Sequence, residues 1–235
     1  MDNYLYLIIN LSAITLPLAC SFEHRVNYFK KFLSLAPGYL ITSIFFIVWD
    51  IFFTKQGIWG FNKSYLIGKD LFGLPFEEWL FFLCIPYSSL FIHFCKEKLT
   101  PGLKFSGSIT RYIVIGLVAF LLVLSILNLD KFYTFSSFAL ASIVMIFSYI
   151  RSPKLLSSFF TSFIFILIPF FIINGLLTGS SIPNEIVWYN NSHNLGIRIG
   201  TIPFEDIFYG FSLLFLPLYI NNELTTRHNA PKVRS

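Results

Sequence analysis

Residues 75–95 read PFEEWLFFLCIPYSSLFIHFC, a run with two acidic residues in its first turn and no further acidic or basic charge. A helix needs roughly 20 apolar residues to cross a hydrocarbon core of about 30 Å, so this run predicts a transmembrane helix. Hydrophobicity is continuous rather than alternating, which favours a helix over a barrel strand. Six further runs of this kind cover residues 4–22, 33–54, 110–129, 133–150, 154–177 and 203–220. The expected fold class is an all-α integral membrane protein with seven transmembrane helices.

The composition agrees with a chain whose surface faces lipid. Of the 235 residues, 55% are hydrophobic and 12% are charged, and the mean hydropathy is +0.70. A soluble domain carries about twice this charged fraction. The basic residues lie in short connections and form no patch with interleaved aromatic residues, which argues against nucleic acid as a partner.

The distribution of basic residues predicts the orientation in the membrane. Met1, Asp2 and Asn3 carry no positive charge ahead of the first run, so we expect an uncleaved first helix. Connections two, four and six hold Lys55, Lys63, Lys69, Lys131 and Arg198. The odd connections and the C-terminal tail hold Arg25, Lys30, Lys31, Lys96, Lys98, Lys104, Arg111, Arg151, Lys154, Arg227, Lys232 and Arg234. The positive-inside rule then places the N-terminus outside a multi-pass cell membrane protein and the C-terminus in the cytoplasm.

Two long connections repeat one pattern. Residues 62–78 and 190–206 both fit Asn-x5-Gly-x6-Pro-Phe-Glu-[Glu/Asp], at a constant offset of 128 residues. The matched positions are Asn62 with Asn190, Gly68 with Gly196, Pro75 with Pro203, and Glu77 with Glu205. Just upstream, Asp50-x3-Thr54 and Asn174-x3-Thr178 end the preceding runs. We interpret this as a duplication: two parallel three-helix repeats, 1–100 and 132–235 with its polar C-terminal tail, joined by a linker helix within 101–131.

In parallel repeats, both acidic motifs begin helices at the same face of the membrane. Glu77, Glu78, Glu205 and Asp206 would then converge, and we predict them as the catalytic groups. An alternative is that they only cap helix starts, because a helix N-terminus stabilises negative charge and Pro75 and Pro203 suit a first turn. Within each pair, the first acid is the preferred pocket residue, since position 77 and position 205 are both glutamate.

Five segments together resemble the membrane-integral lycopene cyclase family, which occurs as two small subunits or as one fused chain and is distinct from flavin-dependent cyclases. They read FFIVWD (45–50), GIWGFN (57–62), LPFEEWLFF (74–82), NGLLTG (174–179) and RIGTIPFEDIFYGF (198–211). The chain looks like a fused form. The resemblance implies a carotenoid cyclase that converts the linear ψ-ends of lycopene into cyclic, β-type ends without net redox change, hence an isomerase or intramolecular lyase.

This chemistry needs a general acid that protonates an alkene and a base that removes a proton after ring closure. No metal or cofactor is expected, and the sequence lacks the G-x-G-x-x-G fingerprint of flavin or nicotinamide sites. The expected partners are a linear carotenoid as substrate and membrane lipid. A carotenoid cyclase could also contact other enzymes that act on carotenoids.

Further residues can support the site. Asp50 and Asn174 can hydrogen-bond the carboxyl groups or simply cap their own helices, and Arg198 can pair with an acid or remain a solvated charge. Aromatic rings can stabilise a cation, although packing is the commoner role for any single ring. The predicted supporting set is Asp50, Thr54, Asn62, Asn174, Thr178, Asn190 and Arg198, and the predicted cation-stabilising set is Trp59, Trp79, Trp188 and Tyr209.

Three other functions are compatible with some of these features. A membrane prenyltransferase needs aspartate-rich clusters for magnesium diphosphate, and the acidic pairs here are not aspartate-rich. A seven-helix retinal protein needs a lysine in the seventh run, and none lies between Pro203 and Tyr219. A non-enzymatic carotenoid- or lipid-binding protein would use the same pocket and stays open.

Overall fold

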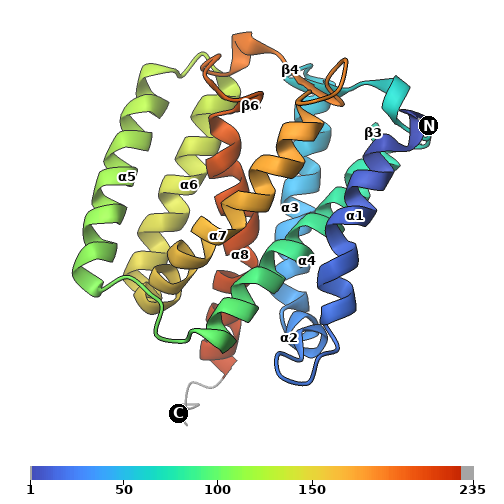
Figure 1. Cartoon of the computed structure of the whole chain (residues 1–235). Coiled ribbons are helices and arrows are strands. Elements are labelled where there is room, and N and C mark those ends of the chain that lie inside the picture. The colour runs from blue at the N-terminus through green and yellow to red at the C-terminus, as the bar shows by residue number, and fades with distance from the viewer. Residues whose placement is uncertain (1, 229–235) are drawn as a thin grey trace, which may run out of the picture.

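The computed structural model describes residues 2–228, and Met1 and residues 229–235 lie outside the described part of the chain, including the tail residues Lys232 and Arg234. Long helices dominate it (Figure 1). In chain order the helices are α1 (Leu5–Cys20), α2 (Tyr28–Ser34), α3 (Ala36–Lys55), α4 (Phe76–Leu99), α5 (Gly107–Leu127), α6 (Phe132–Arg151), α7 (Pro153–Leu177) and α8 (Glu205–His228). Three short 3-10 helices are η1 (Asp2–Tyr4), η2 (Lys63–Tyr65) and η3 (Asn191–His193).

Six of the seven predicted spans have the length and hydropathy of membrane helices within the described residues: η1 with α1, α3, α4, α5, α6 and α7. The seventh, α8, is a long helix that does not reach this hydropathy. It begins with Glu205 and Asp206, and it continues past the predicted end at residue 220 through polar residues to His228. Part of the predicted tail is therefore helical.

The two halves of the chain exchange their middle helices. The first and third helices of each half pack together, α1 on α4 and α6 on α8. The second helix of each half instead packs on the third helix of the other half, so that α3 contacts α8 and α7 contacts α4. The linker α5 lies against α6 at one side of the bundle (Figure 1). This exchange places the starts of α4 and α8 around one shared interior.

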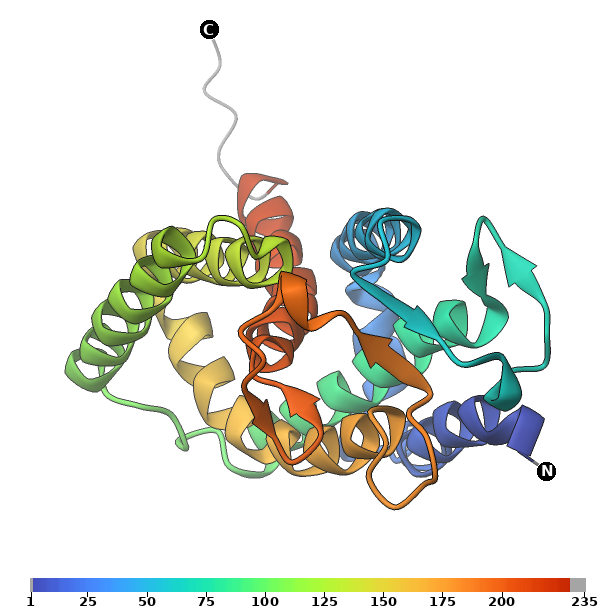
Figure 2. The ribbon, with the colours of Figure 1, turned by 90° about the horizontal axis from the view of Figure 1, so that it is seen from above.

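A small β-ladder joins the halves at the end where α4 and α8 begin. Strand β1 (Trp59–Phe61) lies beside β4 (Val187–Tyr189) in Figure 2 and pairs with it antiparallel. In this register Gly60 is opposite Trp188. A Cβ atom at residue 60 would lie 2.4 Å from the Trp188 ring. Hairpins β2 (Asp70–Leu71) with β3 (Leu74–Pro75), and β5 (Arg198–Ile199) with β6 (Ile202–Pro203), lead directly into α4 and α8.

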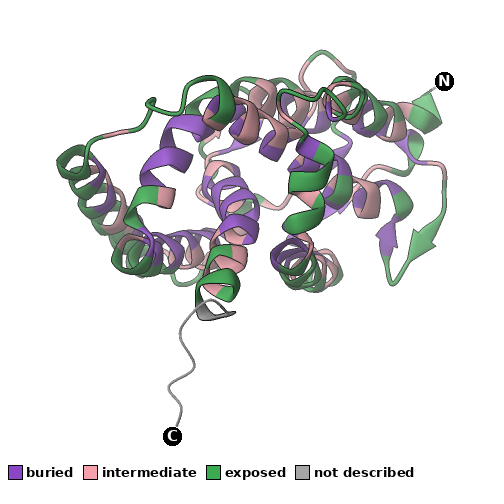
Figure 3. Ribbon diagram, turned by 90° about the horizontal axis from the view of Figure 1, so that it is seen from below, coloured by how far each residue is buried: buried purple, intermediate pink, exposed green. Residues whose placement is uncertain are grey.

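Burial follows the expected sidedness of a membrane bundle. Buried residues line the facing sides of the helices and exposed residues the outside (Figure 3). The largest hydrophobic cluster includes Leu90, Phe138, Phe159 and Phe215, each fully buried. Exposed side chains on the outer faces are mostly apolar, for example Leu16 and Ile126, which suits contact with lipid.

The α3–α8 contact leaves no room for a side chain at Gly38. A Cβ atom there would lie 2.4 Å from the backbone oxygen of Pro217. We expect Gly38→Ala to lower the free energy of unfolding by about 1–3 kcal/mol, as overpacking does, measured by thermal unfolding in detergent. The matched control is Gly116→Ala on α5, where a Cβ meets nothing within 4 Å. Equal stability of the two variants would contradict the close α3–α8 contact.

Candidate active site

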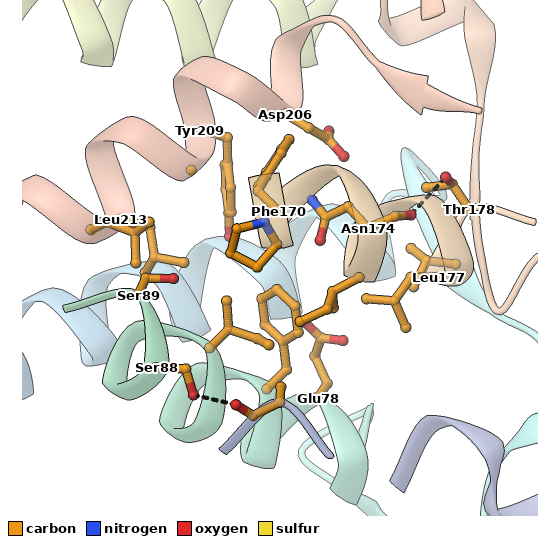
Figure 4. A pocket seen from close by; sticks show the side chains of 18 of the residues that line it. Glu78, Ser88, Ser89, Phe170, Asn174, Leu177, Thr178, Asp206, Tyr209 and Leu213 are labelled. Carbon is orange, nitrogen blue, oxygen red and sulfur yellow. Dashed lines mark hydrogen bonds between the residues drawn. The ribbon is translucent and has the colours of Figure 1, made fainter. Parts of the chain in front are cut away.

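A cavity of about 380 Å³ lies between the two halves, below the β1–β4 ladder. Its wall is mainly apolar and aromatic, with contributions from α1, α3, α4, α6, α7 and α8. Three carboxyl groups line it: Asp50 from α3, Glu78 from α4 and Asp206 from α8. Glu78 and Asp206 approach from opposite sides, with Tyr209 and Asn174 between them (Figure 4).

Glu78 and Asp50 form one acidic group on the side of the first repeat. Glu78 is 7% exposed and accepts a hydrogen bond from the Tyr6 hydroxyl at 2.5 Å. Its carboxyl group lines the same cavity as that of Asp50, and the two acidic groups interact electrostatically. Asp50 Oδ1 accepts from Trp59 Nε1 at 2.5 Å and from Thr54 Oγ1 at 3.3 Å. Asp50 therefore does more than cap its own helix.

Asp206 lies on the other side of the cavity and receives two phenol hydrogen bonds. Tyr133 donates to Oδ1 at 2.5 Å, and Tyr189 donates to Oδ2 at 3.0 Å. Burial and the neighbouring Asp206 raise the pKa of the Tyr189 phenol well above its ordinary value. That phenol therefore remains protonated near neutral pH and acts as a donor.

Arg198 is not the ion-pair partner of an acid. Its guanidinium lies 5.8 Å from the centre of the Tyr189 ring and donates to the Thr201 carbonyl at 2.7 Å and to Asn191 Oδ1 at 3.1 Å. Among the described side chains, ion pairs within 4 Å involve only other residues, namely Glu23 with His24, Glu97 with Lys96, and Glu223 with Arg151. The cavity carboxyl groups thus lie in an apolar wall without a directly paired cation.

The preference for Glu77 and Glu205 as the pocket residues is wrong. Both are fully buried, and neither lines the cavity. Each instead accepts a hydrogen bond from the loop ahead of its helix: Ile67 N to Glu77 Oε1 at 2.6 Å and Leu195 N to Glu205 Oε1 at 2.7 Å. Consecutive helical residues point about 100° apart, so the first acid of each pair holds the loop and the second faces the cavity.

The other predicted supporting residues also divide into those that line the cavity and those that hold the loops. Asn174 and Thr178 line the cavity, and Thr54 contacts it through Asp50. Asn62 and Asn190 do not line it. Each caps a short 3-10 helix: its side-chain oxygen accepts a hydrogen bond from the backbone nitrogen two residues later in the chain, at 3.1 Å in both copies. The repeated asparagines therefore shape the two loops.

Two of the four predicted aromatic residues line the cavity. Trp59 and Tyr209 do so, with ring centres 6.1 Å apart. Trp79 lies elsewhere and donates to the Leu71 carbonyl at 3.1 Å. Trp188, 39% exposed, packs over Gly60 in the ladder. Of the four, only Trp59 and Tyr209 are placed to stabilise a cation in the cavity.

Sequence reasoning missed the tyrosines that hold the acids. Tyr6 in α1 and Tyr133 in α6 donate to Glu78 and Asp206, respectively, and occupy similar places in the first helix of each repeat. Tyr189 in β4 provides the third phenol. Tyr6 and Tyr133 are 127 residues apart, close to the 128-residue offset of the repeat, and this spacing is the signal that could have identified them. It is weak, because the chain has 12 tyrosines and each of these two tyrosines contacts an acid more than 70 residues away in sequence.

Comparison with known proteins agrees with this duplicated site. A family model described as lycopene cyclase matches the chain twice, over residues 3–96 and 130–223. The bifunctional lycopene cyclase/phytoene synthase of Podospora anserina is 28% identical over 99 residues, which cover 42% of this chain and 16% of that much longer protein. No solved structure matches. Because the two family matches together cover most of the sequence and each contains one acidic motif, the chain belongs to the lycopene cyclase family.

Proposed function

We propose that the protein is a carotenoid cyclase that converts the linear ψ-ends of lycopene or a related carotene into β-type rings inside the central cavity. One observation carries the proposal: three carboxyl groups, held by phenol and indole donors, face a mainly apolar and aromatic cavity. Such a cavity suits a hydrocarbon, and the carboxyl groups can add and remove a proton.

The reaction matches what these groups supply. A carboxylic acid gives its proton to the terminal alkene, which leaves a cation at the dimethyl carbon. The π electrons of the next alkene form the new ring bond, and the cation moves to the methyl-bearing ring carbon. A carboxylate then takes a ring proton, and the C–H electron pair becomes the ring double bond. Proton gain equals proton loss, so the reaction is an isomerisation. Trp59 and Tyr209 offer π faces to the cation.

The shape of the cavity supports a long substrate that enters from the lipid. Leu16 and Ser12 on α1 line the cavity and are also exposed on the surface of the bundle. Pro169 and Phe170 on α7, both half-buried, also line the cavity. The volume lies in the range of sites for small ligands, whereas a C40 chain is comparable in length to the ~30 Å hydrocarbon core. The cavity thus accommodates an end group while the remaining chain stays between α1 and α7.

Expression in cells that accumulate lycopene tests the function directly. Cyclic carotenoids should appear in pigment extracts of cells with the intact chain and be absent with a variant in which Asp50, Glu78 and Asp206 are replaced by amides. Copurification of unchanged lycopene without any cyclic product would identify a carotenoid-binding protein instead.

No metal or flavin is part of this proposal. Purified protein in lipid vesicles is expected to retain its rate of ring formation, within about twofold, after treatment with a chelator and without added nucleotide. The carboxyl groups alone supply the proton steps. An absolute dependence on reduced flavin or on a metal ion would contradict the acid–base account.

We also propose that the β1–β4 end of the bundle faces outside and that the α4–α5 connection faces the cytoplasm. In a background with Cys20, Cys84 and Cys95 replaced by alanine, Ser64→Cys and Ser192→Cys should react with an impermeant maleimide on intact cells. Lys104→Cys should react only after permeabilisation. All three positions are exposed. The reverse labelling pattern would invert the orientation.

A further inference from the structure

The two repeats differ at one cavity position that the duplication makes equivalent. Asp50 lies near the end of α3 and Asn174 near the end of α7, each four residues before a threonine, and both line the cavity. The first repeat thus contributes two carboxyl groups, Asp50 and Glu78, whereas the second contributes one, Asp206. This inequality suggests that the repeats no longer do the same chemistry.

The two carboxyl groups of the first repeat need a proton between them. Asp50 is 2% exposed, and its Oδ2 has no hydrogen-bond donor among the described residues. The neighbouring acidic group is the carboxyl of Glu78, which lines the same cavity and interacts with Asp50. Two ionised carboxylates side by side in an apolar wall would repel each other, whereas one shared proton removes the repulsion. Tyr6 donates to Glu78 Oε2 and Trp59 donates to Asp50 Oδ1, which stabilises the pair.

Asp206 has the opposite surroundings. Both of its oxygens accept hydrogen bonds from phenols, Tyr133 at 2.5 Å and Tyr189 at 3.0 Å. Hydrogen bonds donated to both oxygens stabilise an ionised carboxylate. The guanidinium of Arg198 lies 5.8 Å from the centre of the Tyr189 ring, so a positive charge sits beside one of the phenols that donate to Asp206. An ionised carboxylate in an apolar cavity is suited to accept a proton.

We propose that Asp50 and Glu78 form the proton-donating pair of the cyclase and that Asp206 is the base that ends the reaction and selects the position of the ring double bond. The pair protonates the alkene carbon next to the dimethyl carbon. After ring closure, Asp206 removes a proton beside the cationic ring carbon. Before the next turnover Asp206 releases that proton to water, and the pair takes up a proton from water. This assignment rests on the proposed function and adds a separate role for each repeat.

The assignment is tested by cyclisation in deuterium oxide with intact protein, Asp50→Asn and Asp206→Asn, followed by mass and ring analysis of product and recovered lycopene. The intact protein should introduce one deuterium per ring. Asp50→Asn should lower turnover about 10²-fold or more, as expected for loss of a general acid, and leave recovered lycopene unlabelled and ring type unchanged. Asp206→Asn should still protonate the substrate, so that recovered lycopene gains deuterium and the ring products become a mixture of double-bond positions.

Label and ring type are read from molecules that reacted, so these readouts do not depend on the fraction of folded protein. Glu205→Gln, next to Asp206 but away from the cavity, is the matched control and should keep a single ring type. Unlabelled lycopene with an unchanged ring type in Asp206→Asn, or mixed rings in Asp50→Asn, would overturn the assignment. A lack of ring products with the intact chain would instead refute the proposed function itself.

Discussion

Glu78→Gln is expected to lower the rate of ring formation by about 10²-fold or more, the range for a general acid–base group. Glutamine keeps the shape of the side chain and can still accept the Tyr6 hydrogen bond, but it cannot give a proton to an alkene. The rate is measured with purified protein in lipid vesicles that contain lycopene and is expressed per folded molecule.

Glu77→Gln is the matched control, one residue earlier on the same helix. Glu77 accepts a hydrogen bond from Ile67 N at 2.6 Å and does not line the cavity. The weaker acceptor should lower the free energy of unfolding by about 1 kcal/mol and leave the rate per folded molecule close to that of the intact chain. If Glu77→Gln abolished ring formation and Glu78→Gln did not, the cavity would not be the reaction site.

The starts of α4 and α8 were predictable because their signals are local. Two acids ahead of a long apolar run specify the start of α4 without any tertiary contact. The prolines are not first-turn residues, because Pro75 and Pro203 end strands β3 and β6, one residue before α4 and two residues before α8. The duplication was predictable for the same reason, since matched spacings survive in sequence. The exception is α8, whose polar ends lower its hydropathy while the bundle buries its middle.

The choice between the two acids of each pair was not predictable from the repeat. Identity of glutamate in both copies favours residues 77 and 205 as reactive groups when the sequence alone is considered. In the structure this identity reflects a shared loop contact with a backbone nitrogen ten residues earlier. Sequence alone cannot separate the two roles, because residues 77 and 78 point to different sides and only the packing of α4 determines which side is the cavity.

The pairing of Asp50 with Glu78 was likewise beyond the sequence. Asp50 was predicted to tune a carboxyl group or to cap its own helix, and both readings fit its position at the end of an apolar run. The exchange of middle helices puts α3 beside α8 rather than only beside its own repeat. That arrangement brings Asp50, Trp59 and Tyr209 to one wall of the cavity, and it depends on contacts between distant segments.

Ala13→Trp is expected to reduce ring formation from lycopene at least tenfold, which corresponds to about 1.4 kcal/mol in the barrier. Ala13 lies on α1 beside Leu16, in the part of the cavity that reaches the bundle surface. An indole there would occupy the space through which the chain of the substrate passes. Ala13 is half-buried at the edge of the cavity rather than in the packed core, so the fold should tolerate the larger side chain. The rate is measured in lycopene-containing vesicles.

Ala19→Trp provides the control for this change, because Ala19 is exposed on the same helix and does not line the cavity. It should leave the rate unchanged. A short isoprenoid with one ψ-end, which fits wholly inside the cavity, should lose less rate with Ala13→Trp than lycopene does, since no chain must pass the indole. Equal losses for both substrates would mean that the indole disturbs the reacting groups, and an unchanged rate with lycopene would place the entrance elsewhere than between α1 and α7.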